Sequence, residues 1–415
     1  MSQMDREFDV IVFGATGFTG YLTAEYLLKQ YGLGDNLRWA IAGRSPDKLD
    51  KARAQLQTDT GVETTSLSTL VADASNLELM RDLASRTHVV CTTVGPYALY
   101  GSQLVEACAL TGTHYCDLTG EVHWIRRMID QHHETAASNN ARIVFTCGFD
   151  CIPADLGTFF LQNEVRSRFG KPSPKIKFRV KGFKGGASGG TIASMVNMME
   201  EASADPEVLR TMNHPYSLNP KAERSGPDGA EPTRPAYDDD FDQWTAPFVM
   251  GTIDTKIVRR TNAMLGYAYG KDFRYDEAML SGKGPAGFAK AAGTAASSMA
   301  AMGAMAIGPL RRLIAPRLPA PGEGPTPEER KAGYFDIRFL AESPNDPSVK
   351  VGAQVTGDRD PGYGSTSKML AESAVCLALD ELTGPVGMLT PASAMGEALL
   401  IRLQQHAGLT FSIER

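Results

Sequence analysis

Apolar and polar residues alternate along the first 150 residues in blocks that predict a parallel α/β sheet. Residues 8–13 (FDVIVF) form a continuous apolar run ending at Gly14, which is typical of a strand buried on both faces. Similar runs follow at about 38–42, 67–71, 88–93, 113–117 and 142–146. Segments of helical pattern separate them, at about 19–30, 46–57, 76–85, 101–111 and 121–139. This alternation predicts a Rossmann-type doubly wound parallel sheet over residues 1–150.

The spacing of apolar residues changes after residue 150. In three later segments they alternate with polar residues, as in antiparallel strands with one exposed face: 176–181, 335–341 and 349–356. We therefore predict a second domain, an α+β substrate domain with an antiparallel sheet, over 151–358. Two stretches within it are predicted as long loops, 213–247 and 315–327. Helical pattern returns at about 366–383 and 392–405, before a short strand near 409–413.

One stretch, 291–310, contains no charged residue and is followed by two arginines. Its length could span a bilayer, but Ala, Gly and Ser dominate it and contribute little insertion energy. We expect a buried, close-packed helix whose regularly spaced methionines lie in the core. Contact of 286–312 with an acyl chain or a membrane surface stays open as the alternative.

Composition and charge exclude several classes of protein. The 415 residues are 42% hydrophobic and 22% charged, which is ordinary for a folded chain of two domains. Lys and Arg number 42 against 48 Asp and Glu, a net charge of −6, so no overall basic field favours nucleic acid. The six cysteines form no C-x-x-C pair, and the polar N-terminus lacks a signal-peptide pattern. We expect a cytoplasmic protein without a nucleic-acid partner, and peripheral attachment to a membrane stays open.

A glycine-rich turn follows the first predicted strand. Gly14, Gly17 and Gly20 have the spacing G-x-x-G-x-x-G at a junction of strand and helix. Glycines there permit a tight turn and let a pyrophosphate approach backbone N–H groups at the positive end of the helix dipole. The sequence thus predicts a dinucleotide site that includes Gly14, Ala15, Thr16, Gly17, Phe18 and Thr19.

The second predicted strand ends in Gly43, Arg44 and Ser45, where an enzyme that prefers NAD usually has an acid. Arg44 can pair with a 2′-phosphate through two N–H groups, and Ser45 can donate a hydrogen bond to the same group. These residues favour NADP as the cofactor. Further cofactor contacts are expected where the third and fourth strands end, at Asp73, Ala74, Val94, Gly95 and Pro96.

Several long motifs together resemble those of the saccharopine dehydrogenase-like NADP-binding oxidoreductases, and most closely their trans-acting enoyl reductase branch. They span nearly the whole chain and include FDVIVFGATGFTG, TTVGPYALYG, CGFDCIPADLG and GYGSTSKMLAESA. The resemblance implies an NADP-binding Rossmann domain, an inserted substrate domain and C-terminal helices, 359–415, that return to the first domain. Cys151 departs from the family pattern, in which Ser is typical.

The resemblance also implies an NADPH-dependent reductase that acts in trans on a double bond of an acyl or polyketide-lipid intermediate. Such a reaction adds a hydride to Cβ of an unsaturated thioester and a proton to Cα, so the protein must supply an oxyanion donor and a proton source. The catalytic candidates follow strands four to six: Tyr97, Asp117 and Asp150. A phenol can fill both roles, so Tyr97 is the preferred donor, with aromatic packing as its alternative. Asp117 could instead cap a helix, and Asp150 could order the crossover between domains.

The expected partner is a hydrophobic acyl substrate, carried by an acyl carrier protein or a polyketide synthase, and a homodimer stays open. No metal is expected, because the spacing of His114, Cys116, Cys147 and Cys151 matches no standard zinc site. Two other functions stay open. One is a saccharopine-type amino-acid dehydrogenase, which needs several cations at the nicotinamide. The other is a non-catalytic NADP-binding protein associated with lipid surfaces.

Overall fold

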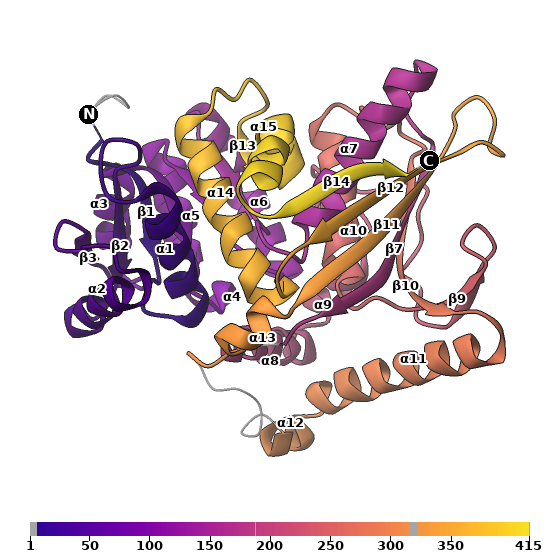
Figure 1. Ribbon diagram of the computed structural model, residues 1–415, viewed down its shortest axis with the longest axis horizontal. Helices are drawn as coiled ribbons and strands as arrows, with labels where there is room; N and C mark the ends of the chain where they lie inside the picture. Colours follow the sequence, from indigo (N-terminus) through magenta and orange to yellow (C-terminus); the bar gives the residue numbers. More distant parts are fainter. Residues whose placement is uncertain (1–5, 187, 315–321, 415) are drawn as a thin grey trace.

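Two seven-stranded sheets, set side by side, organise the protein. The computed structural model describes residues 6–186, 188–314 and 322–414. In Figure 1 the first sheet, formed mostly by the indigo N-terminal part of the chain, lies at the left, and the second lies at the right. The yellow C-terminal helices lie between them. The predicted α/β class with a second, mainly antiparallel sheet is confirmed.

The first sheet is parallel throughout and has the strand order β13-β6-β5-β4-β1-β2-β3. Its strands are β1 (Phe8–Phe13), β2 (Trp39–Gly43), β3 (Ser68–Val71), β4 (Thr87–Thr92), β5 (His114–Cys116), β6 (Arg142–Val144) and β13 (Gly387–Leu389). Every residue of β1 is buried, as its continuous apolar run predicts. The chain fills the sheet outward from β1 in both directions, so a crevice opens where the carboxyl ends of β1 and β4 diverge.

Helices cover both faces of this sheet. On one side α1 packs beside α14, which contacts β1, β4 and β5; on the other α3, α5 and α6 contact the strands. Ser45 caps α2 by accepting a hydrogen bond from the backbone N–H of Lys48, with Pro46 in the first turn. These helices are α1 (Phe18–Tyr31), α2 (Pro46–Thr60), α3 (Leu77–Ser85), α4 (Tyr97–Tyr100), α5 (Ser102–Thr111), α6 (Val122–Ser138) and α14 (Thr366–Leu379).

The second sheet has the order β14-β12-β11-β7-β10-β9-β8 and is antiparallel except between β7 and β10. Its strands are β7 (Lys175–Lys184), β8 (Ala236–Asp238), β9 (Gln243–Ala246), β10 (Arg274–Gly282), β11 (Tyr334–Glu342), β12 (Lys350–Gly357) and β14 (Leu409–Glu414). Burial alternates strictly along β11 and β12, as their period of two predicts.

The remaining helices lie on or beside the second sheet. Both α7 and α10 contact its strands, and the short π-helical turn η3 precedes α14. The helices are α7 (Ile152–Phe169), α8 (Gly189–Ala204), α9 (Pro206–Asn213), α10 (Gly251–Met264), α11 (Gly284–Ala306), α12 (Gly308–Ile314), α13 (Pro327–Lys331), η3 (Pro361–Ser365) and α15 (Pro391–Gln405).

The prediction of a loop over all of 213–247 is wrong, because β8 and β9 lie within it. Asp238 binds Lys177 and Arg179 of β7, at 2.7 Å each, and these ion pairs hold the two short strands at the sheet edge. Within the second predicted loop, 315–327, residues 315–321 lie outside the described part and α13 begins at Pro327.

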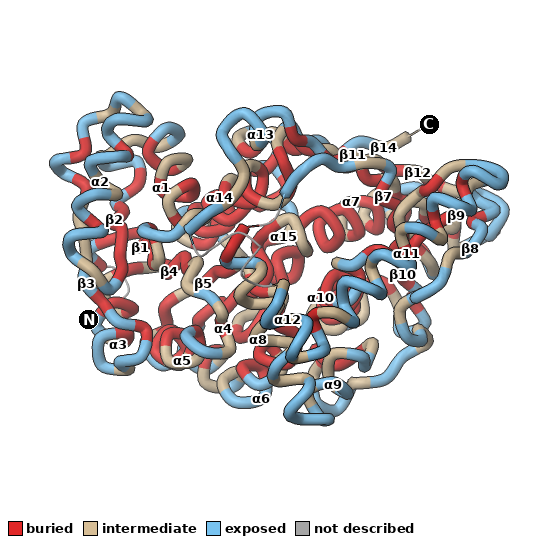
Figure 2. The backbone as a smooth tube through the Cα atoms, turned by 90° about the horizontal axis from the view of Figure 1, so that it is seen from below, coloured by how far each residue is buried: buried red, intermediate tan, exposed pale blue. Residues whose placement is uncertain are grey.

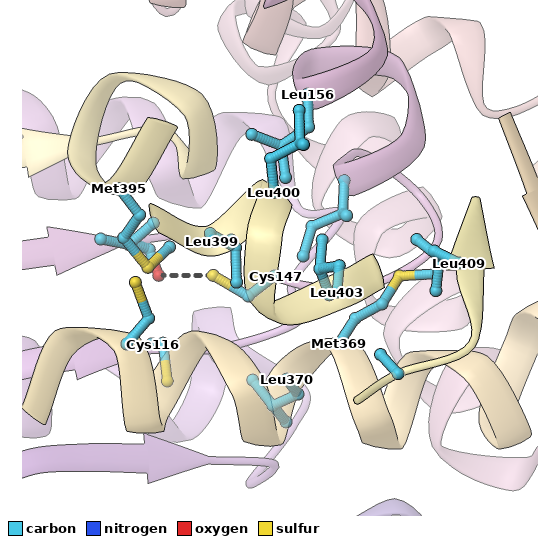
Figure 3. Close-up of a cluster of buried hydrophobic side chains, with 14 of the residues drawn as sticks. Cys116, Cys147, Leu156, Met369, Leu370, Met395, Leu399, Leu400, Leu403 and Leu409 are labelled. Atoms are coloured by element: carbon cyan, nitrogen blue, oxygen red, sulfur yellow. Dashed lines mark hydrogen bonds between the residues drawn. The ribbon is translucent and has the colours of Figure 1, made fainter. Parts of the chain in front are cut away.

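The C-terminal segment joins the two sheets. Strand β13 pairs with β6 in the first sheet, and β14 pairs with β12 in the second. Figure 3 shows the core that results: Leu399, Leu400 and Leu403 of α15 pack with Met369 of α14 and with Leu156 of α7. One hydrophobic cluster thus extends across both sheets.

The expectation of a buried helix at 291–310 is wrong. On α11 the residues Gly287, Ala291 and Ala295 are buried, against β9 and β10, and of the three methionines Met305 alone is buried. Met299 is 63% exposed and Met302 48%. Small residues let one side of the helix approach the sheet closely. The helix also contacts α8 and α12, but most of the rest of its surface is exposed. No helix in the described ranges is long and apolar enough to cross a bilayer.

Candidate active site

The turn between β1 and α1 excludes side chains at two glycines. Gly14 has a φ of +95°, and a Cβ there would lie 2.8 Å from both Thr93 Oγ1 and Val94 Cγ2. A Cβ at Gly20 would lie 2.2 Å from the Gly14 carbonyl oxygen. Gly17 occupies the N-cap of α1 and brings no side chain to cover the first turn. The turn therefore presents backbone N–H groups at the crevice, and it fits a pyrophosphate.

The ends of β2 and β3 lie beside this turn. A Cβ at Gly43 would come 3.7 Å from the Thr16 side chain. Arg44 is exposed, and its charge, together with two hydrogen bonds from Ser75 (2.9 and 2.8 Å), lowers the pKa of Asp73, the Ser75 bonds having the larger effect. Arg44 thus stands at the crevice rim with its guanidinium accessible to a ligand.

The loop after β4 closes the other side of the crevice. Thr93 Oγ1 donates to the Gly14 carbonyl (3.3 Å), and the peptide bond between Gly95 and Pro96 is cis. The Glu121 carboxylate accepts from the backbone N–H groups of Tyr97 and Ala98, at 2.8 Å each. These contacts fix the loop in place at the carboxyl end of β4.

Tyr97 lies inside the first domain and not on the open face of the crevice. Its ring packs 5.6 Å from Trp124, and its hydroxyl donates to the Thr92 carbonyl at 3.3 Å. Burial raises the pKa of Tyr97 well above its ordinary value, with the Asp117 charge as the second cause. These contacts favour the packing role, and the donor role of Tyr97 stays a prediction.

Asp117 is also buried, and both of its carboxylate oxygens accept hydrogen bonds. Tyr115 donates its hydroxyl to Oδ2 (2.7 Å), and the N–H groups of Thr119 and Thr146 donate to Oδ1 (3.1 and 3.0 Å). Burial raises the pKa of Asp117 to about 7 in spite of these bonds. Asp117 therefore holds the turns after β5 and β6 together, and a direct catalytic role stays a prediction.

Asp150 is more exposed than Tyr97 and Asp117. It follows β6 at the start of the crossover to α7 and is half-buried. Its carboxyl makes no hydrogen bond within the described residues, and burial raises its pKa to about 6. A Cβ at Gly120 would lie 3.9 Å from Asp150 Oδ2, so the carboxyl lies next to the turn after β5. Such a group can hold a proton near neutral pH and release it.

Elements of the second half of the chain close over the crevice, and Tyr363 and Ser194 among their residues were not predicted from the sequence. The Tyr363 ring of η3 lies 5.2 Å from Phe18, and its hydroxyl meets the Ser188 N–H and, at 2.8 Å, Thr191 Oγ1. Ser194 of α8 bonds to Glu121. The glycines around 185–191 and 362–364 could have indicated these contacts from the sequence, because glycine permits close approach of the backbone.

A pocket of about 520 Å³ adjoins the glycine-rich turn. Phe18 forms one wall, and the guanidinium of Arg330 lies 5.6 Å from its ring. The lining residues are Phe18, Gly322, Glu323, Gly324, Pro325, Thr326, Pro327 and Arg330. The α13 region therefore borders the cofactor-binding turn.

A buried acidic cluster lies behind Asp150. Cys151 Sγ donates to Asp254 Oδ1 (3.4 Å), and the Tyr275 hydroxyl donates to Glu277 Oε1 (2.8 Å). The other oxygen of Glu277, Oε2, can form a hydrogen bond with Asp254 only if one of the two carboxyls is protonated. Burial raises the pKa of Glu277 to about 8, and it also raises that of Asp254. The pair thus retains at least one proton at neutral pH.

No group of three metal-binding side chains gathers anywhere in the ranges the structure describes. All six cysteines are free and buried. Cys147, for instance, points its thiol at the Val144 carbonyl in the core (3.8 Å; Figure 3).

The sequence profile of the saccharopine dehydrogenase NADP binding domain matches residues 10–144. Together with the parallel sheet and its glycine turn, this match defines the class: an oxidoreductase that binds a nicotinamide nucleotide. The whole chain is 38% identical over 430 residues to a trans-acting enoyl reductase of Mycobacterium ulcerans, covering 100% of both chains. It is 39% identical over 416 residues to one of Mycobacterium tuberculosis, covering 97% of both. The chain therefore belongs to the family of trans-acting enoyl reductases, and the predicted relationship is confirmed.

A solved structure supports the fold. The apo saccharopine dehydrogenase (L-Glu forming) of Saccharomyces cerevisiae matches 98% of this chain and 99% of its own, with a TM-score of 0.51 and 11% identity. The two chains share an arrangement of elements.

Proposed function

We propose that this protein is an NADPH-dependent enoyl reductase that acts in trans on an acyl chain held as a thioester by a carrier protein or a polyketide synthase. One observation carries the proposal. Asp150, a half-buried carboxyl with a raised pKa and no hydrogen bond within the described chain, lies at the carboxyl edge of the dinucleotide-binding sheet. The trans-acting enoyl reductases of Mycobacterium ulcerans and Mycobacterium tuberculosis, which this chain resembles over at least 97% of its length, support the same reaction.

NADPH, when bound, supplies the hydride for Cβ. The backbone N–H groups of residues 14–20 would hold its pyrophosphate, and Arg44 with Ser45 would bind its 2′-phosphate. Because NADH lacks this phosphate, Arg44 is the basis for proposing NADP over NAD. Asp150 then delivers a proton to Cα, and Tyr97 and Asp117 keep the loops beside the nicotinamide in position.

The saccharopine-type alternative gains no support from the side chains near Asp150. A dicarboxylic substrate needs cations there, but Asp254 and Glu277 are acidic, and the buried Lys256 beside them donates to the Thr252 carbonyl (2.6 Å). Arg259 forms ion pairs with Asp228 and Glu231, at 2.9 Å each. An apolar acyl chain, unlike a dicarboxylic substrate, needs no cation at this site.

The test is oxidation of NADPH by the full chain with an enoyl thioester, compared with reduction of NADP⁺ in the presence of saccharopine. We expect turnover only with the thioester. Asp150→Asn should lower kcat by about 10²- to 10⁴-fold, the usual contribution of a general acid, and should leave the Kd for NADPH unchanged. Asp82→Asn, an exposed Asp on α3, is the matched control. Activity with saccharopine alone would refute the proposal.

A further inference from the structure

The far end of α11 and the helix α12 together expose a run of large apolar side chains. Met299 is 63% exposed and Leu313 59%, and both belong to a set that we call the α11–α12 face: Met299, Met302, Ile307, Leu310 and Leu313. In Figure 1 α11 runs along the lower edge of the molecule, with α12 at its free end. Figure 2, seen from below, shows both helices mostly exposed. Exposed apolar patches of this kind mark contact surfaces.

The two helices that carry this face contain charges of one sign only. Between Lys283 and Ile314 the sequence contains four cations and no acid, although the whole chain has a net charge of −6. Lys290 and Arg312 are exposed, and neither forms an ion pair with a described residue. The other two cations, Lys283 and Arg311, pair with Asp242 and Glu200 of neighbouring elements. Exposed apolar side chains next to unpaired cations are typical of helices that lie in the headgroup region of an anionic bilayer.

The face is connected to the proposed active site. Arg311 of α12 forms an ion pair with Glu200 of α8 (3.0 Å). Ser194, on the same helix α8, bonds to Glu121, which holds the loop after β4. A surface docked through α11 and α12 would therefore lie next to the helix that closes the crevice.

We propose that the α11–α12 face docks the protein on an anionic lipid surface. The apolar side chains insert at the level of the headgroups, and Lys290 and Arg312 bind lipid phosphates. An acidic carrier protein fits less well, because the exposed set is apolar and its cations lie at the margins. A second copy of this chain would bring the same cations against each other.

The test is co-sedimentation of the full-length protein with vesicles of phosphatidylcholine, with and without about one third phosphatidylglycerol. We expect binding to the anionic vesicles to be about tenfold stronger or more, and to weaken as salt is raised. Met299→Glu/Met302→Glu should reduce it by about tenfold or more. Leu209→Glu/Ile401→Glu, two exposed positions on α9 and α15, makes the same charge change elsewhere and should leave binding intact.

NADPH oxidation with a soluble enoyl thioester should be equal in all three proteins, so failure of the enzymatic proposal is distinguishable from failure of this one. Three outcomes would overturn the docking proposal. They are no binding to anionic vesicles, an equal loss in both double variants, and a dimer in light scattering that Met299→Glu/Met302→Glu converts to a monomer.

Discussion

The glycine turn after β1 and the acidic cluster behind Asp150 are built in opposite ways. The turn lies within residues 14–20, and its geometry follows from what glycine lacks. The cluster brings together Cys151, Asp254 and Glu277, which come from the start of α7, from α10 and from β10. A site made of consecutive backbone can be recognised in a sequence, whereas a site made of distant side chains depends on the whole fold.

The largest effect is expected at the turn. In Gly20→Ala the new methyl group would lie 2.2 Å from the Gly14 carbonyl oxygen, so the turn must shift. We expect NADPH binding to weaken by about 100-fold or more, close to 3 kcal/mol, in a fluorescence titration. Gly303→Ala, in an open position on α11, is the control and should gain up to about 1 kcal/mol of stability. Equal binding by the two variants would contradict a backbone-built site.

Arg44→Ala tests the side-chain contribution to the same site. Loss of hydrogen bonds between a guanidinium and a phosphate should weaken NADPH binding by about 10- to 100-fold, while the Kd for NADH changes little. Arg53→Ala, on the adjacent helix α2, removes the same charge from a residue paired with Asp50 and should change neither affinity. A parallel loss for both nucleotides would refute the role of Arg44 in cofactor choice.

The acidic cluster should respond to pH. Burial raises the pKa of Glu277 from 4.5 to about 8, so the folded state favours its protonated form. Its stabilising contribution is complete below about pH 4.5 and is lost as pH rises through about 8. The free energy of unfolding of Glu277→Gln, measured in urea, should therefore rise relative to that of the wild type by about 1–3 kcal/mol between about pH 5 and pH 9. Stability curves that stay parallel would show that Glu277 titrates normally.

The smallest effect is expected for Tyr97→Phe, which removes the hydroxyl that donates to the Thr92 carbonyl and accepts from the Leu118 backbone N–H. If Tyr97 has the packing role, stability falls by about 1 kcal/mol and kcat changes by less than about threefold. A fall in kcat of about 100-fold at unchanged stability would instead establish the donor role. Steady-state kinetics and urea unfolding of the same preparations distinguish the two.

The regions that could be predicted from sequence are those in which neighbouring residues decide the structure. The apolar run of β1 and the alternation along β11 and β12 are local patterns. In contrast, β8 and β9 depend on Asp238 reaching Lys177 and Arg179 across the sheet, which no local pattern shows. The burial of Tyr97 depends on Trp124, which is distant in the sequence. The Ala-rich sequence of α11 does not indicate how much of the helix is covered by other elements.

The distribution of the last strands affects how the chain assembles during synthesis. Each sheet receives an edge strand late: β13 at residues 387–389 for the first, and β14 at 409–414 for the second. Until the ribosome has released them, β6 and β12 each present an unpaired edge, and α15 has not yet closed the shared core. Nascent chains stalled before residue 387 should therefore depend on chaperones to avoid edge-to-edge aggregation.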